Sequence, residues 1–308
     1  TYICSIVVDI FNKYDVEVFF YENLDQKLKI PSDQIISSIK NVNSNNKLFF
    51  LWHDYLNIIG DLPDELRDFL QESDIEVLID ATHSIPTKLY KSKYVIYGFR
   101  KLLNQPFGSL LYLDENKSSK SIIELSQMKL LKFLIFHKIS SNIFLLLKSH
   151  NNRIIDSFLK GISKFGDRLS FEKNNFFLFD QFNYSKILNL HKNLDYEEIS
   201  RARNENFLKY LSLLKNTIDI NNFDLSCPYG FPLLVKNNKV VRKKLWSMGV
   251  HSFILWSDLH KDVPSKLSKN SKFLSNANLI LPVNQDLTFN DIERISNICY
   301  IYYAILKE

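Results

Sequence analysis

Glycine, proline and cysteine are all scarce in this sequence. Its 308 residues include 7 Gly and 8 Pro, whereas average usage would give about 20 and 15. Neither GxGxxG nor GxxxxGK[ST] occurs, which excludes the fingerprints of a Rossmann dinucleotide site and of a P-loop NTPase. Cys4, Cys227 and Cys299 are odd in number and far apart. We therefore expect no disulfide framework and no metal site, but buried free thiols in a reducing compartment.

Concentrated positive charge and long hydrophobic runs are also lacking. The net charge is +5, but the lysines are spread along the chain. No basic stripe with interleaved aromatic residues indicates a nucleic-acid partner. The most apolar stretch, residues 130–147, is interrupted by lysine, histidine, serine and asparagine, so it predicts no membrane span. The first residues lack the basic-then-apolar order of a signal peptide, and we expect a cytoplasmic protein.

The first third of the chain, up to about Asp114, alternates between short strands and helices. Helices are expected at residues 31–39, with Ser32 as the N-cap, and at 63–71, where acidic residues follow a proline. The expected strands are apolar and rich in β-branched or aromatic residues: 16–21, 47–52, 76–80, 93–97 and 109–113. This order is typical of an α/β fold with a mostly parallel sheet and helices on both faces.

The pattern changes beyond Lys117. Helical spacing covers residues 121–136 and 151–164, and a smaller α+β unit begins near Asp195. In that unit, helices are expected at 196–214, 240–248 and 289–306, and a strand at 232–236. The sequence therefore predicts three regions, which are a large domain (1–118), a helical connecting region (119–194) and a small C-terminal α+β domain (195–308).

Polar residues follow two neighbouring strands of the predicted sheet. The run VLID ends in Asp80, with His83 three residues later, and the next apolar strand leads to the segment 98–101 (GFRK), which ends in Lys101. Ligands of parallel sheets bind at the carboxyl ends of the strands. An Asp and a Lys on successive strand ends are the parts that a pyridoxal phosphate site needs. The lysine carries the cofactor as a Schiff base, and the aspartate keeps the pyridine nitrogen protonated.

Residues 75–113 resemble the fold-type I pyridoxal-phosphate aminotransferases, and within them the sugar-nucleotide branch often called the DegT family. In that branch, an aspartate that ends a strand is followed three residues later by glutamine or histidine. A second strand then leads to a serine-x-x-lysine motif and to a glycine that starts the next strand. The matching residues here are Asp80, His83, the GFRK segment and Gly108. Weaker similarity extends over most of the chain, at residues 48–55, 227–235, 240–256 and 281–285.

The resemblance implies roles for the residues of this motif. Lys101 is the catalytic lysine that forms the Schiff base, Asp80 binds the pyridine nitrogen, and His83 stacks on the cofactor ring or donates a hydrogen bond to it. Arg100 pairs with a phosphate or carboxylate through its planar fork, or forms a structural ion pair. The structural alternatives for the other three are a solvated lysine, a capping aspartate and a packed core histidine.

Three residues outside the motif are also candidates. His53 lies at the end of an earlier strand, where the resemblance implies contact with substrate or cofactor, although its aromatic neighbours also suit a packed histidine. Trp256 and Asn204 are expected to line the substrate side. We therefore assign these three residues to substrate binding.

The sequence departs from the family pattern at two places. Gly98, which we include in the cofactor site, stands where the family usually has the phosphate-binding serine. Complete family members also carry a stretch before the segment that residues 1–4 resemble, and its helix N-terminus cradles the cofactor phosphate. The sequence as given is expected to begin after that stretch.

The predicted function is amino-group transfer from an amino acid, in the family usually glutamate, to a keto-sugar nucleotide for surface polysaccharide biosynthesis. The resemblance also implies a homodimer whose sites lie at the subunit interface. One alternative is an inactive scaffold or binding subunit that has lost the cofactor. Another keeps the cofactor but performs dehydration or lyase chemistry.

Overall fold

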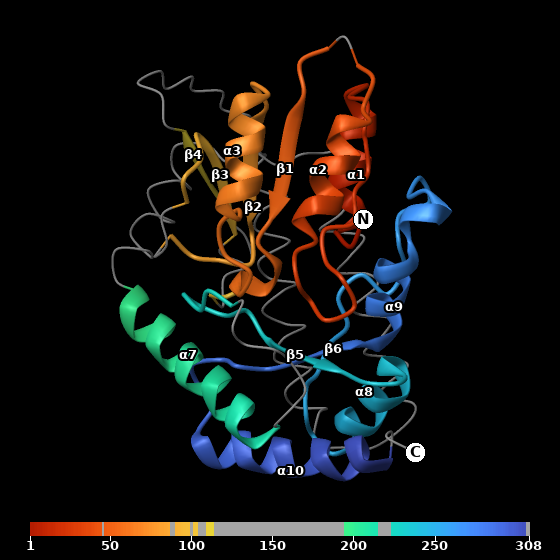
Figure 1. Cartoon of the computed structure of the whole chain (residues 1–308). Coiled ribbons are helices and arrows are strands. Elements are labelled where there is room, and N and C mark those ends of the chain that lie inside the picture. Colours follow the sequence, from red (N-terminus) through yellow and green to blue (C-terminus); the bar gives the residue numbers. More distant parts are fainter. Residues whose placement is uncertain are drawn as a thin grey trace, which may run out of the picture. The chain divides into compact units, whose positions relative to one another are not determined.

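A four-stranded sheet organises the N-terminal part of the chain (Figure 1). The computed structural model describes residues 1–44, 46–86, 90–98, 101–103, 109–113, 194–214 and 223–305. The strands are β1 (Phe49–His53), β2 (Glu76–Ala81), β3 (Tyr94–Gly98) and β4 (Ser109–Leu113), in that spatial order. The first three are parallel and β4 is antiparallel to β3. The prediction of a mostly parallel α/β sheet is therefore confirmed.

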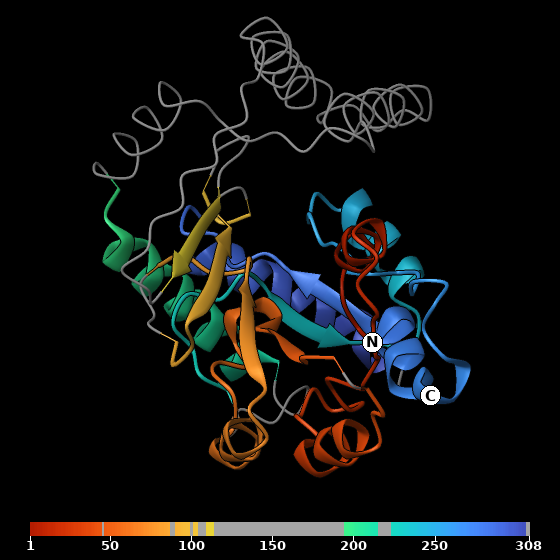
Figure 2. The same cartoon turned by 90° about the horizontal axis from the view of Figure 1, so that it is seen from above.

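Three helices and a short 3-10 turn accompany these strands: α1 (Ser5–Lys13), α2 (Ser32–Lys40), η1 (Tyr55–Asn57) and α3 (Asp64–Glu72). In Figures 1 and 2, α2 and α3 lie side by side, and α3 also contacts β2. Each buries apolar side chains, namely Ile35 on α2 and Leu66 and Leu70 on α3. Ser32 is wrong as the N-cap, because Pro31 occupies that position and no side chain caps the helix.

The predicted strand at residues 16–21 is also wrong. Its backbone groups bond elsewhere than to a strand, since the N–H of Val16 donates to the carbonyl of Phe11 in α1 and the carbonyl of Tyr21 accepts from the N-terminal amine of Thr1. The Tyr21 hydroxyl donates to the carbonyl of Leu51 in β1 over 2.6 Å. This carbonyl of β1 is therefore paired with a side chain and not with the backbone of a neighbouring strand. Val16 and Phe19 are 49 % and 43 % exposed. An apolar alternation without a pairing partner does not form a strand.

The C-terminal part is a small α+β arrangement around an antiparallel strand pair. The pair is β5 (Phe231–Leu234) and β6 (Asn278–Leu281). The helices are α7 (Tyr196–Leu213), α8 (Asn238–Ser247), α9 (Lys269–Ala277) and α10 (Phe289–Ile305), with the 3-10 turn η3 (Ser265–Leu267). The side chain of Asn237 caps α8 by accepting from the N–H of Val240. Figure 1 shows α7 and α10 next to each other, and the two helices are in contact.

By their contacts, Thr1–Leu103, Ser109–Asp114 and Tyr196–Glu308 form one compact unit. The division into three regions stays a prediction, and the predicted helices at 121–136 and 151–164 lie outside the described residues. The apolar stretch 130–147 lies outside them as well. In the part of the chain that the structure describes, no helix is both long and apolar enough to cross a membrane.

The three cysteines are free thiols. Cys227 and Cys299 are buried, and burial raises their pKa to about 11 and about 12 respectively. Cys4 is only partly buried, so the expectation of a core position is wrong for this residue. It lies directly before α1, at the N-cap position, which leaves part of its side chain accessible.

Candidate functional site

The carboxyl ends of β1, β2 and β3 bring several of the predicted site residues to one edge of the sheet. His53 is the last residue of β1 and is aligned with Asp80 of β2, while Gly98 ends β3. Because the three strands are parallel, residues that follow them emerge on the same side. The edge therefore carries one histidine from β1, one carboxylate from β2 and the segment to Lys101 after β3.

His53 and Asp80 form a buried pair. His53 Nδ1 lies 2.9 Å from Asp80 Oδ2, and the two residues are 6 % and 8 % exposed. The backbone N–H of Thr82 donates to Asp80 Oδ1 over 3.0 Å. Burial alone would raise the pKa of Asp80, but His53, Thr82 and the positive charge of Lys101 together lower it below its usual value. Asp80 is thus a charged carboxylate at neutral pH.

His83 is held in one tautomer. It is 1 % exposed, and its Nδ1 accepts a hydrogen bond from the backbone N–H of Leu56 over 3.1 Å. Burial first, and then the charges of Lys101 and His53, lower the pKa of His83 well below 6.5. The imidazole is therefore neutral, with its proton on Nε2. Among the described residues this buried N–H has no hydrogen-bond partner, so the donor is free to bind a further group.

Two aromatic rings from the C-terminal part stack on His83. Tyr229 lies 4.8 Å from it with an interplanar angle of 19°, and Trp256 lies 5.9 Å away at 16°. Trp256 also meets His53 edge-on at 5.2 Å. Its backbone has a φ of +48°, a left-handed conformation that costs a non-glycine residue about 1–3 kcal/mol. The structure therefore places Trp256 in the cluster, and adds Tyr229, which we did not single out from the sequence.

A buried arginine fixes the backbone at Tyr229. Arg203 on α7 is 2 % exposed and uses three nitrogens, with Nε donating to Pro228 O (2.9 Å), Nη2 to Tyr229 O (3.1 Å) and Nη1 to Gln285 Oε1 (2.8 Å). Burial lowers the pKa of Arg203, but a guanidinium stays protonated in proteins. Its fork thus fixes the backbone that carries the Tyr229 ring.

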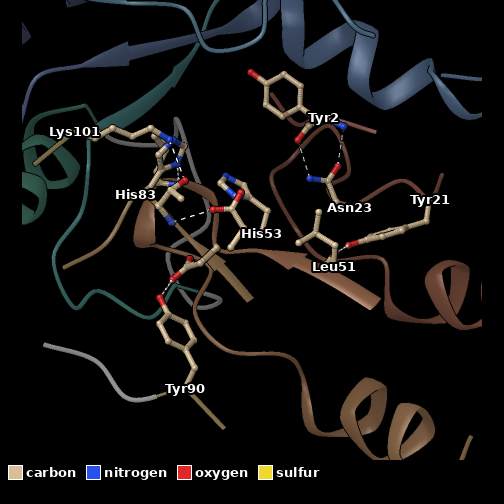
Figure 3. A network of polar contacts seen from close by, with 12 residues as sticks. Tyr2, Tyr21, Asn23, Leu51, His53, His83, Tyr90 and Lys101 are labelled. Atoms are coloured by element: carbon tan, nitrogen blue, oxygen red, sulfur yellow. Dashed lines mark hydrogen bonds and ion pairs between the residues drawn. The ribbon is translucent and has the colours of Figure 1, made fainter. Parts of the chain in front are cut away.

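Lys101 approaches the cluster from the segment after β3. Its Nζ donates to Thr82 Oγ1 over 3.1 Å (Figure 3). Gly98 is needed at the end of β3, because a Cβ there would lie 2.6 Å from the carbonyl oxygen of Thr82. Position 98 therefore has no room for a serine side chain unless β2 or β3 moves. Arg100 lies outside the described residues.

A strained loop directly after β1 carries the backbone N–H of Leu56, which donates a hydrogen bond to His83. Leu56 and Asn57 both have left-handed backbones, with φ of +54° and +55°. Asp54, fully buried, holds the loop by accepting from Tyr90 OH (2.5 Å) and from Gly60 N (2.9 Å). This network is not apparent from the sequence, although Asp54 lies only two residues after the predicted strand 47–52.

Asn204 lies apart from the other predicted residues. It is on α7, where its Nδ2 donates to Ser226 O over 3.2 Å. It also lines an open depression of about 420 Å³ together with Ser200, Arg201 and Ser226. The described contacts join Asn204 to the segment 225–226 and not to His53, Asp80 or His83.

No family model and no curated protein sequence matches the chain. Solved structures do. An aminotransferase of the DegT DnrJ EryC1 StrS group from Brucella abortus has 12 % identity and a TM-score of 0.59, over 98 % of this chain and 78 % of its own. The aminotransferase TlmJ from Streptoalloteichus hindustanus has 12 % identity and a TM-score of 0.60, over 97 % and 76 %.

The chain shares their fold. A third structure, a GDP-4-keto-6-deoxy-D-mannose-3-dehydratase from E. coli with bound hydrated PLP, has 15 % identity and a TM-score of 0.57, over 94 % of this chain and 75 % of its own. The resemblance found in the sequence is thus confirmed as a similarity of fold. Within the described ranges, no group of three or more His, Cys, Asp or Glu residues could hold a metal ion.

The neutral state of His83 predicts how stability depends on pH. The unfolded chain takes up a proton on this residue below about pH 6.5, whereas the folded chain does not until its lowered pKa is reached. Stability therefore falls with decreasing pH, by up to about 1.4 kcal/mol per unit from this group. In His83→Gln this contribution is absent. Urea unfolding between about pH 7.5 and 5.5 should show a flatter pH dependence than wild type, and equal slopes would contradict the prediction.

Proposed function

We propose that this protein binds pyridoxal phosphate and transfers an amino group from an amino acid to a keto-sugar nucleotide. The observation that carries the proposal is that Asp80 and Lys101 are both hydrogen-bonded to Thr82, next to His83, at adjacent strand ends of an aminotransferase fold. The neighbours add the substrate class, since one solved structure is of an enzyme with its TDP-sugar product. The pathway, surface polysaccharide biosynthesis, rests on the sequence resemblance alone.

The donor set fits the pyridine end of this cofactor. Each carboxylate oxygen of Asp80 accepts one hydrogen bond in the structure and has a further lone pair, so the charged group can also bind a protonated ring nitrogen. The Nε2–H of His83 is a buried donor without a partner in the described part. Tyr229 and Trp256 already stack on His83. We therefore assign His83 to a hydrogen bond with an oxygen attached to the cofactor ring, and not to stacking on that ring.

The bound cofactor would supply the electron sink that acidifies the Cα–H bond of the amino donor. The amine of Lys101 would hold the cofactor covalently until the amine of the donor displaces it, and the freed Nζ would then move the proton from Cα to the carbon of the cofactor that carries the amino group. His53 would keep Asp80 charged and oriented through Nδ1. Trp256 would shield the site from water on the substrate side.

The remaining assignments complete the proposal. Arg100 would bind the cofactor phosphate, Gly98 would allow the close approach of β3 to β2, and Asn204 would contact the far end of a long substrate. The protein would act as a cytoplasmic homodimer. The alternative of an inactive scaffold is favoured by one observation, which is that Gly98 leaves no space for a phosphate-binding hydroxyl.

The direct test is covalent attachment. Wild-type protein is mixed with pyridoxal phosphate, reduced with borohydride, digested and analysed by mass spectrometry. The proposal expects one added cofactor on the peptide that contains Lys101. Glutamate should then convert the unreduced complex and release its keto acid, and a panel of keto-sugar nucleotides should reverse the conversion. No attachment at saturating cofactor would refute the proposal and leave the scaffold.

A further inference from the structure

Thr82 connects the separate parts of the candidate site. Its backbone N–H donates to Asp80 Oδ1 over 3.0 Å, and its Oγ1 accepts from Lys101 Nζ over 3.1 Å. We propose that Thr82 is a positioning residue, whose hydroxyl holds the amine of Lys101 next to Asp80 and His83. The proposal rests on the proposed function, because it concerns the lysine that would bind the cofactor.

Lys101 needs such an anchor because its side chain is long and exposed. A lysine has four side-chain torsions and loses much rotamer freedom when its amine is fixed. Position 98 cannot supply an anchoring side chain, since a Cβ there would collide with the Thr82 carbonyl. Lys101, three residues after Gly98, reaches the Thr82 hydroxyl on the same side.

A hydroxyl suits this role in both protonation states of the lysine. It accepts a hydrogen bond from the ammonium ion, and it can still accept one from an N–H of the neutral amine. Thr82 is half-buried, and among the described residues its hydroxyl bonds only to Lys101. The contact orients Nζ before the cofactor arrives. When the amine loses its proton, its lone pair stays free for the cofactor, because an N–H and not the lone pair bonds to the hydroxyl.

Two substitutions separate the hydroxyl from the shape of the side chain. Thr82→Val keeps the volume and removes the hydroxyl, whereas Thr82→Ser keeps the hydroxyl. In cofactor-free protein, the acetylation rate of Lys101 is measured by mass spectrometry between about pH 6 and 10, relative to Lys93 in the same sample. A hydrogen bond to the ammonium favours the charged form. We therefore expect Thr82→Val to shift the profile to lower pH and to raise the relative rate near pH 8 about threefold, while Thr82→Ser follows wild type.

The second measurement is the rate of cofactor attachment, trapped with borohydride. It should fall about tenfold in Thr82→Val and stay within about twofold of wild type in Thr82→Ser. Superimposable acetylation profiles for wild type and Thr82→Val, or a serine variant that behaves like valine, would overturn the proposal. If wild type binds no cofactor, the proposed function fails, but the acetylation profiles still decide whether Thr82 holds Lys101.

Discussion

Lys101→Ala should abolish covalent retention of pyridoxal phosphate. The same substitution should lower the rate of amino transfer by about 10²–10⁴-fold, the usual contribution of a positioned acid–base group, with a further loss from the missing covalent step. The physical reason is that Asp80 and His83 remain in place, but the amine that would form the covalent bond is missing. Attachment is measured as the mass added after borohydride reduction, and transfer as keto acid released from glutamate.

Two variants control this experiment. Lys93→Ala removes an exposed lysine just before the start of β3, at its opposite end, and should keep wild-type attachment. Lys101→Arg keeps the positive charge near Asp80 but cannot form the covalent bond, so it separates charge from chemistry. Attachment of one cofactor per chain to Lys101→Ala would show that another lysine is the reactive one. Because the Lys101 side chain is exposed, unfolding free energies of these variants should agree within about 0.5 kcal/mol.

Arg203→Met should lower the free energy of unfolding by about 3 kcal/mol or more. The substitution keeps the aliphatic stem but leaves the carbonyls of Pro228 and Tyr229 and the amide oxygen of Gln285 without their donor. Buried acceptors that lose their partner cost about 1–3 kcal/mol each. The measurement is urea unfolding at neutral pH. Since the Tyr229 backbone is released, the variant should also bind the cofactor more weakly than its loss of stability alone explains.

The matched control lies on the same helix. Arg201 is two residues earlier on α7 and is exposed, so Arg201→Met should change the free energy of unfolding by no more than about 0.5 kcal/mol. Arg203→Lys is the second comparison, because an ammonium group cannot form all three hydrogen bonds in the geometry of the planar fork. Equal stability of Arg203→Met and Arg201→Met would refute the bracing role of Arg203.

The sheet and its polar edge could be predicted from the sequence because both depend on local patterns. A buried parallel strand is a short apolar run, and a charged residue at its end, such as Asp80, stands out against that run. Helix ends were also predicted within a few residues. The strand at 16–21 shows the limit of such patterns, since alternation of apolar residues says nothing about whether a neighbouring strand is available.

The remaining contacts of the site depend on segments far apart in the chain. Arg201 and Arg203 cannot be told apart by the helical pattern of the sequence. Arg203 is buried because it donates to the carbonyls of residues 228 and 229, which come from a distant segment. Tyr229 on His83 is a similar case, because the two residues lie far apart in the sequence and in loops outside the strands. Two short elements were not predicted from the sequence, for another reason. The polar helix α9 and the four-residue strand β6 have too few apolar positions to show a period.

The left-handed turn at Leu56 and Asn57 also bears on how the chain folds. The carbonyls of Leu56 and Ile58 accept hydrogen bonds from the N–H groups of Tyr229 and Asp224, so this strained turn is stabilised by residues more than 160 positions away in the sequence. Contacts of such long range form late and raise the contact order. The edge that carries Asp80 and His83 is consequently completed only when the C-terminal segment docks, and the two parts should unfold together in one cooperative transition.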